Sequence, residues 1–197
     1  EQSDETLELG SGVRLQSLAD SDAVPEMLRE SARREAGWNL RNAATLGGTV
    51  AAGDGRSPLL TVLVALQAEI LIEPEGRWAD LDLVLSGRHD SFRGKLMTSM
   101  RFRVPAGQGY DQVARTPADA PIVCVAVASW AGGPLSVALG GFGPAPLRLA
   151  AEGGVSDFVQ AASLAYSQAE DAWASAAYRS EVAGVLVQRT LEGIGLK

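Results

Sequence analysis

The stretch from Arg41 to Gly55 carries almost no large side chains. It reads Arg-Asn-Ala-Ala-Thr-Leu-Gly-Gly-Thr-Val-Ala-Ala-Gly-Asp-Gly. Glycines let a ligand approach main-chain N–H groups, and successive N–H groups in such turns can form a concave site for phosphates. The stretch lacks the Gly-Lys-Ser/Thr of a P-loop and the Gly-x-Gly-x-x-Gly of a Rossmann turn. Glycine content alone therefore leaves a phosphate-binding loop and a plain structural loop equally open.

The composition narrows the class of protein. The 197 residues are 46% apolar, enough for one good core or two small ones. No apolar run reaches the roughly 18 residues of a membrane span, and the acidic start Glu-Gln-Ser-Asp-Glu is unlike a signal peptide. The net charge of −7 without a basic patch argues against nucleic acid as a partner. We therefore expect a cytoplasmic protein.

The side chains that usually carry catalysis are scarce. His89 is the single histidine, and no Gly-x-Ser-x-Gly nucleophile turn accompanies it, so we expect a solvated loop residue. The lone Cys124 excludes an internal disulfide, and its apolar neighbours predict an inert thiol in a buried strand. No group of residues has metal-ligand spacing. We predict neither catalytic residues nor a metal site, so any redox chemistry requires a cofactor.

Hydrophobic periodicity predicts a first unit at residues 1–90. A polar segment, Gly87–Asp90, ends this unit. The expected elements are a strand and a helix before the glycine stretch, then a helix with Ser57 as N-cap, and finally a hairpin. Their ranges are Leu7–Gly10, Val24–Glu35, a helix starting near Ser57-Pro58, and strands Ala68–Glu73 and Arg77–Leu83 around the turn Pro74–Gly76.

A second unit is expected at residues 91–197. It begins with alternation over Lys95–Val104, which places Met97 and Met100 on opposite faces of a strand. Antiparallel strands with a Gly132-Gly133 turn follow, and then two helices, which together make the chain α+β. The ranges are Tyr110–Arg115, Ile122–Trp130 and Leu135–Leu139 for the strands, and Val155–Gln168 and Tyr178–Leu191 for the helices.

The order of residues in the glycine stretch is more specific than its composition. Arg41-Asn42-x-x-Thr45-Leu46-Gly47-Gly48-x-Val50-Ala51 resembles the flavin-contacting loop in the FAD-binding (medium) subunit of molybdenum hydroxylases. That family includes the xanthine dehydrogenases and the aerobic carbon monoxide dehydrogenases. Further similar segments follow in the family's order: Ser57–Leu60 through Ala65–Ala68, Tyr110–Val123 with Arg115 and Asp119, Ala138–Arg148, and Tyr178–Arg189.

The resemblance implies a fold, a cofactor and partners. The fold is a partial second subdomain of the PCMH-type FAD-binding unit, followed by the C-terminal domain of carbon monoxide dehydrogenase flavoproteins, a small antiparallel sheet backed by helices. The cofactor is FAD, with Leu46 near the flavin. The partners are a large molybdopterin-binding subunit and a small 2Fe–2S subunit in a hetero-oligomer. The remaining implied contacts are Thr45, Gly47, Gly48 and Thr49 along the pyrophosphate, and Asp54 and Ser57 on the polar chain of FAD.

Several positions depart from the family pattern. Thr49 replaces an asparagine, Asp111-Gln112 stands where a lysine often faces the flavin, and Asp54 or Ser57 must substitute for an aspartate ahead of the next helix. The Ala-Gly-Gly turn of the family's N-terminal FAD subdomain is not found before Arg41. Two alternatives therefore stay open: a structural or assembly paralogue with a degenerate FAD site, and a module that binds another phosphate-bearing ligand.

Overall fold

The first sheet is built mainly from the N-terminal half of the chain. The computed structural model describes residues 6–87, 92–151 and 153–196, so His89 lies outside the described residues. The sheet is antiparallel, in the order β1-β4-β2-β3. Its strands are β1 (Thr6–Gly10), β2 (Glu69–Glu73), β3 (Arg77–Asp80) and β4 (Leu96–Arg103). Because β4 pairs with β1 and β2, we propose that the change of unit follows Arg103 rather than residue 90.

The helices of this half include several that the sequence did not predict. The prediction of a strand as far as Leu83 is wrong, because β3 ends at Asp80 and α6 begins at Leu81. The buried residues Leu81, Val84 and Leu85 are spaced as on one face of a helix, and their burial favours a helix here over a strand. A further unpredicted helix, α1, precedes α2. The bounds are α1 (Leu15–Asp20), α2 (Glu26–Glu35), α3 (Trp38–Arg41), α4 (Leu46–Ala52), α5 (Pro58–Ala65) and α6 (Leu81–Ser86).

Strand β4 does not alternate along its whole length. The pairing of β2 with β4 shifts between Leu71 and Ile72, so that Ile72 lies opposite Met97 while Ile70 lies opposite Met100. Met97 and Met100 are therefore both buried in the same core, and the prediction that they lie on opposite faces is wrong. A β-bulge inserts one residue and reverses the in-and-out phase, which sequence alternation alone does not reveal.

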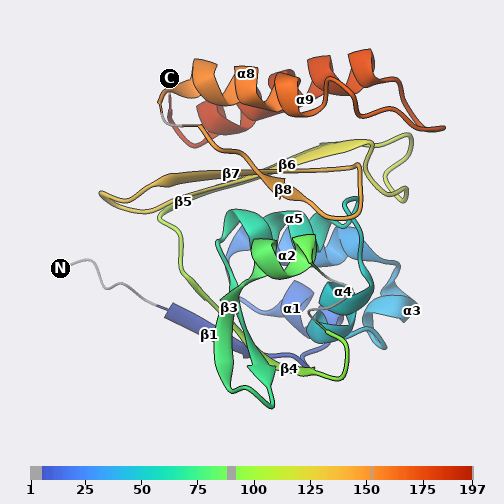
Figure 1. Ribbon diagram of the computed structural model, residues 1–197, viewed down its shortest axis with the longest axis vertical. Helices are drawn as coiled ribbons and strands as arrows, with labels where there is room; N and C mark the ends of the chain where they lie inside the picture. The colour runs from blue at the N-terminus through green and yellow to red at the C-terminus, as the bar shows by residue number, and fades with distance from the viewer. Residues whose placement is uncertain (1–5, 88–91, 152, 197) are drawn as a thin grey trace.

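The second sheet and its helices match the expected α+β class. The sheet is antiparallel in the order β5-β6-β7-β8, and Gly132 at φ 63° forms the predicted turn between β6 and β7. Helices α8 and α9 cover its outer face (Figure 1). Cys124 is buried in β6, as predicted. The bounds are β5 (Gly107–Val113), β6 (Val123–Ser129), β7 (Leu135–Gly140), β8 (Leu147–Arg148), α8 (Val155–Ala165) and α9 (Ala176–Gly193).

Helix α5 lies between the two sheets (Figure 1), and all eight of its residues are buried. A helix that is apolar on every side must be covered on every side. The second sheet covers one side with the small side chains Ala126, Ala128 and Ala138, which belong to the core around α5. The larger Val125 and Val127 point the other way, into a separate core with α8 and α9. The two faces of one sheet thus serve two cores.

Among the helices of the described residues, none is both long and apolar enough to cross a bilayer.

Candidate functional site

The glycine stretch forms a short helix rather than an open loop. Thr45 caps α4, and its hydroxyl oxygen accepts a hydrogen bond of 3.1 Å from the amide of Gly48. The amides of Leu46 and Gly47 donate to the carbonyl oxygens of Val13 and Ser11, each at 2.8 Å. The first amides of α4 therefore already have partners within the protein, although the sequence suggested that they face a ligand.

Gly47 serves close packing. A Cβ atom at this position would lie 2.9 Å from Cβ of Ser11 and 3.0 Å from Cε of Met97. The neighbouring Gly48 has a different environment, because it is exposed together with Ala51 and Ala52. Spacings of three and four residues place these three on one side of α4. That side carries nothing larger than a methyl group, so a ligand can lie directly against the helix.

A charged cleft of about 760 Å³ opens where α4 ends. Both halves of the chain line it: the end of α2, the loop after α4, and the segment from Pro117 to Ala120. Of the predicted site residues, Asp54 and Ser57 line the cleft. The others, Thr45, Leu46, Gly47, Gly48 and Thr49, lie along α4 outside the cleft lining. At a rise of 1.5 Å per residue, α4 spans about 10 Å from its N-terminus to its last residue, Ala52, which lines the cleft.

Ser57 caps α5 and holds a carboxylate that the sequence did not single out. Its hydroxyl accepts a hydrogen bond of 3.0 Å from the amide of Leu60, as predicted for an N-cap, and donates one of 2.8 Å to Oε2 of Glu35. The same Oε2 accepts from the amide of Leu59 at 3.0 Å. Burial raises the pKa of Glu35, which the bonds from Leu59 and Ser57 partly oppose. In the sequence, this glutamate resembles any charge on the solvated side of a helix.

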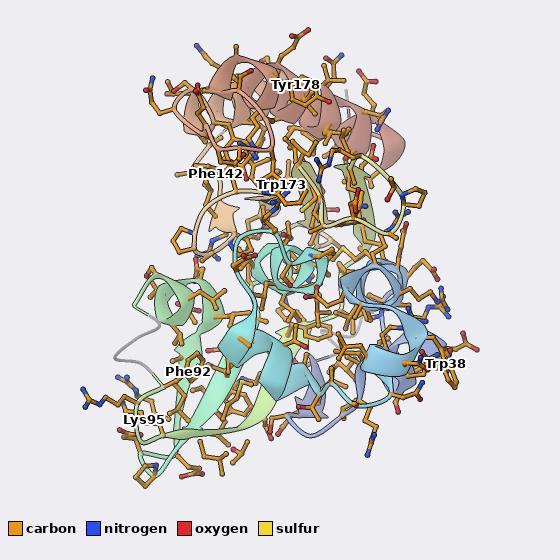
Figure 2. The ribbon with its side chains drawn as sticks, turned by 90° about the vertical axis from the view of Figure 1, so that its right-hand side faces the viewer. Trp38, Phe92, Lys95, Phe142, Trp173 and Tyr178 are labelled. Atoms are coloured by element: carbon orange, nitrogen blue, oxygen red, sulfur yellow. The ribbon has the colours of Figure 1, made fainter. Side chains whose placement is uncertain are left out.

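An indole stacks between two guanidinium groups beside the cleft. The ring of Trp173 lies 4.0 Å from the guanidinium carbon of Arg56 and 4.1 Å from that of Arg115. Figure 2 shows Trp173 between the C-terminal helices and the layer that contains α5. Arg56 also lines the cleft and donates to the carbonyl of Pro121 at 3.3 Å, while its buried Nη2 has no partner among the described residues. Cation–π contacts thus fix one cleft arginine to the second half of the chain.

The loop that carries Trp173 is held by a fully buried arginine. Arg179 donates to the carbonyl oxygens of Ala169 and Ala174 at 2.9 and 3.0 Å, and to the carboxylate of Asp171 at 2.8 Å. Desolvation raises the pKa of Asp171, but the hydrogen bonds from Arg179 and from the amides of Trp173 and Ala174, together with the charge of Arg179, lower it overall. Arg179, in the segment Tyr178–Arg189 that resembles the family, therefore stabilises this loop and is not among the residues that line the cleft.

Asp111 and Gln112 face different surroundings. Asp111 forms an ion pair with Arg189 of α9. Gln112 accepts a hydrogen bond of 2.6 Å from the hydroxyl of Tyr110. Neither residue is among those that line the 760 Å³ cleft. The carboxylate of Asp111 is therefore neutralised by α9 and does not contribute its charge to the cleft wall.

Within the described residues, no cluster of histidine, cysteine and carboxylate side chains has the geometry to hold a metal ion.

The fold defines a class of protein. The chain superposes on carbon monoxide dehydrogenase from Hydrogenophaga pseudoflava with a TM-score of 0.82 and 25% identity, over 98% of this chain and 76% of that one. Quinoline 2-oxidoreductase from Pseudomonas putida 86 shares the fold, with a TM-score of 0.78 at 22% identity and the same coverage. The chain thus has the fold of a chain in carbon monoxide dehydrogenase and in quinoline 2-oxidoreductase.

The sequence comparisons give the family. The profile of the FAD-binding domain in molybdopterin dehydrogenase matches residues 1–100. The protein YgfM of Escherichia coli is 32% identical over 187 residues, which is 92% of this chain and 70% of YgfM. The chain therefore belongs to the family of FAD-binding domains in molybdopterin dehydrogenases.

Proposed function

We propose that this chain binds FAD and relays electrons between the partner subunits of a molybdopterin-dependent oxidoreductase and an electron acceptor. One observation carries the proposal within this family. The exposed side of α4, formed by Gly48, Ala51 and Ala52, leads to a cleft lined by arginine and carboxylate side chains. An elongated dinucleotide needs such a path along bare backbone, with a charged pocket at its end.

The residues present fit the chemistry of such a cofactor. The buried Nη2 of Arg56, without a partner in the described structure, suits a phosphate oxygen, since guanidinium groups bind phosphates well. Asp54 and Ser57 would contact the polar chain of FAD, with Leu46 near the flavin. Thr45, Gly47, Gly48 and Thr49 would lie along the pyrophosphate. When bound, FAD supplies redox chemistry that protein side chains do not provide.

The partners follow from the same family. We propose a large molybdopterin-binding subunit and a small 2Fe–2S subunit, assembled with this chain into a hetero-oligomer. Support comes from the fold neighbours, one of which is a carbon monoxide dehydrogenase described by its molybdenum cofactor. In this arrangement, electrons leave the molybdopterin centre through the iron–sulfur clusters and reach the acceptor through the chain described here.

A structural or assembly role is the second candidate, and one observation favours it. The amides of Leu46, Gly47 and Gly48 are all bonded within the protein, so they offer less to a pyrophosphate than an open loop would. Thr49 likewise turns its hydroxyl inward and donates to the carbonyl of Thr45 at 3.0 Å. A paralogue that keeps the fold without the cofactor would retain these internal bonds.

The absorption spectrum of the purified chain decides between the two. It is recorded before and after incubation with FAD and removal of free cofactor, for the chain alone and co-expressed with its partners. Retained flavin bands that disappear in Gly48→Leu, but persist in Gly12→Leu, are the expected result. Gly12 is a suitable control because nothing lies within 4 Å of a Cβ atom placed there. A colourless yet folded assembly would overturn the flavin proposal and favour the structural role.

A further inference from the structure

One oxygen of the Glu35 carboxyl group is hydrogen-bonded within the protein, and the other is available to the cleft. Both of its hydrogen bonds, from the hydroxyl of Ser57 and the amide of Leu59, end on Oε2. Among the described residues no donor reaches Oε1. Glu35 lines the 760 Å³ cleft together with Asp54 and Arg56. The geometry therefore leaves an acceptor oxygen, fixed in orientation by two hydrogen bonds, in the wall of the cleft.

The charged groups around the cleft do not neutralise Glu35. Arg41 uses its guanidinium on Gln16 and on the carbonyl oxygens at the end of α2. Arg34 pairs with Glu30. In the part of the chain that the structure describes, no cation forms an ion pair with Glu35. A half-buried carboxyl without a counter-ion requires hydrogen-bond donors, because its desolvation is otherwise uncompensated.

We propose that Glu35 binds hydroxyl groups of the cofactor's sugar or sugar-alcohol portion through Oε1. This assignment rests on the proposed FAD-binding function and deepens it. It adds Glu35 of α2 to Asp54 and Ser57, which the sequence suggested for the polar chain of FAD. The partner is a neutral hydroxyl because a carboxylate repels phosphate, which the nearby guanidinium of Arg56 suits instead. Ser57 then has a second task, because its hydroxyl orients Glu35.

A donated hydroxyl would also offset the cost of burying this group. Burial raises the pKa of Glu35, and the charge of Asp54 adds to the rise. Hydrogen bonds to a carboxylate favour its charged form, so a ligand hydroxyl on Oε1 would act against both effects. The empty acceptor position and the raised pKa thus point to the same missing donor.

The test is a titration of the full chain with FAD, ADP and inorganic pyrophosphate, read by calorimetry. In Glu35→Gln, the amide oxygen can keep the bonds from Ser57 and Leu59 while an N–H₂ group replaces Oε1. We expect FAD to bind roughly 10- to 100-fold more weakly, as for the loss of a hydrogen bond to a charged group. Pyrophosphate binding should not change. Glu30→Gln, which alters another carboxylate of the same cleft, should keep FAD affinity within about twofold, the range of an exposed ion pair.

The ADP titration separates the two sources of hydroxyl groups. If Glu35→Gln binds FAD more weakly but ADP as before, the contact is with the sugar-alcohol chain of the flavin half. If it binds both more weakly, the contact is with the ribose. Unchanged affinity for FAD and ADP in Glu35→Gln would overturn the assignment while leaving the proposed function intact. A wild-type chain that binds none of the three probes would overturn both. If Glu35→Gln does not fold, Glu35→Asp, which keeps the charge but shortens its reach, should weaken FAD similarly.

Discussion

The amide of Gly141 donates a hydrogen bond of 2.6 Å to the carbonyl oxygen of Gly55. In the other direction, the amide of Gly55 donates to Gly143 at 3.0 Å. These bonds join the loop after α4 to the turn after β7, at positions far apart in the sequence. A Cβ atom at Gly55 would lie 2.0 Å from the carbonyl oxygen of Phe142, so this backbone contact excludes a side chain.

Gly55→Ala should therefore separate the loop from the turn. We expect a loss of roughly 3 kcal/mol or more in the free energy of unfolding, the upper end of overpacking costs, because the three obstructing atoms, from Phe142 and Gly143, all belong to backbone. Urea denaturation gives the value. Gly12→Ala, with open space around its Cβ position, should change stability by no more than about 0.5 kcal/mol. Equal effects of the two substitutions would contradict the close approach at Gly55.

The two adjacent glycines of α4 should respond differently to the same substitution. In Gly47→Ala the new methyl group meets Ser11 and Met97, which we expect to cost about 1–3 kcal/mol in unfolding free energy. In Gly48→Ala it meets only the side-chain oxygen of Thr45, at 3.1 Å, so stability should change by less than about 0.5 kcal/mol. Thermal unfolding of both variants measures the difference. A reversed order would show that Gly47 is not packed against Ser11.

Arg179 should be far more important for stability than its neighbour Arg189 in the same helix. Replacement of Arg179 by Met removes its buried hydrogen bonds to the carbonyl oxygens of Ala169 and Ala174 and to Asp171, so we expect a loss of about 3–5 kcal/mol in the free energy of unfolding. Arg189→Met removes an ion pair in which the arginine side chain is 61% exposed, and should cost no more than about 1 kcal/mol. Chemical denaturation measures both. Similar losses of unfolding free energy in the two variants would argue against a structural role specific to Arg179.

The pH dependence of stability should carry a contribution from Glu35. Its pKa is raised above the ordinary 4.5, so the folded chain binds a proton here more tightly than the unfolded chain does. Stability due to this group is therefore fully present below pH 4.5 and is lost as the pH rises through the raised value. Glu35→Gln lacks the titration. Denaturation of both proteins across this range should show the wild-type advantage shrinking as the pH rises; a constant difference would refute it.

Local sequence patterns predicted the elements that are long or strongly periodic. The strands β5, β6 and β7 of the second sheet and the helices α2, α8 and α9 follow from alternation or from helical spacing, whereas the two-residue strand β8 was not predicted. The short helices α1, α3, α4 and α6 were not predicted, because a helix of four to seven residues is stabilised mainly by what it packs against. For α4, the deciding contact is Gly47 on Ser11, which no window around the glycines contains. The bulge at Met97 similarly depends on the partner strand.

The candidate site was predictable only in part, and for a related reason. The sequence singled out the glycine stretch and the capping role of Ser57 because those are properties of adjacent residues. It did not indicate that Glu35, 22 residues before Ser57, would bond to that hydroxyl. Nor did it show Trp173 stacked on Arg56, since the two lie in different halves of the chain. Contacts of this kind arise from the packing of α2, α5 and the second sheet.

The position of α5 has a consequence for how this chain can be divided or recombined. Its eight buried residues complete one core while resting on the small side chains of β6 and β7, so neither half keeps a sealed interior alone. A gene fragment that ends after Arg103 would expose one apolar side of α5 to water. Exchange of the C-terminal half with that of a relative would succeed only where the relative also carries small side chains at the positions under α5. The two halves therefore depend on each other for a closed core.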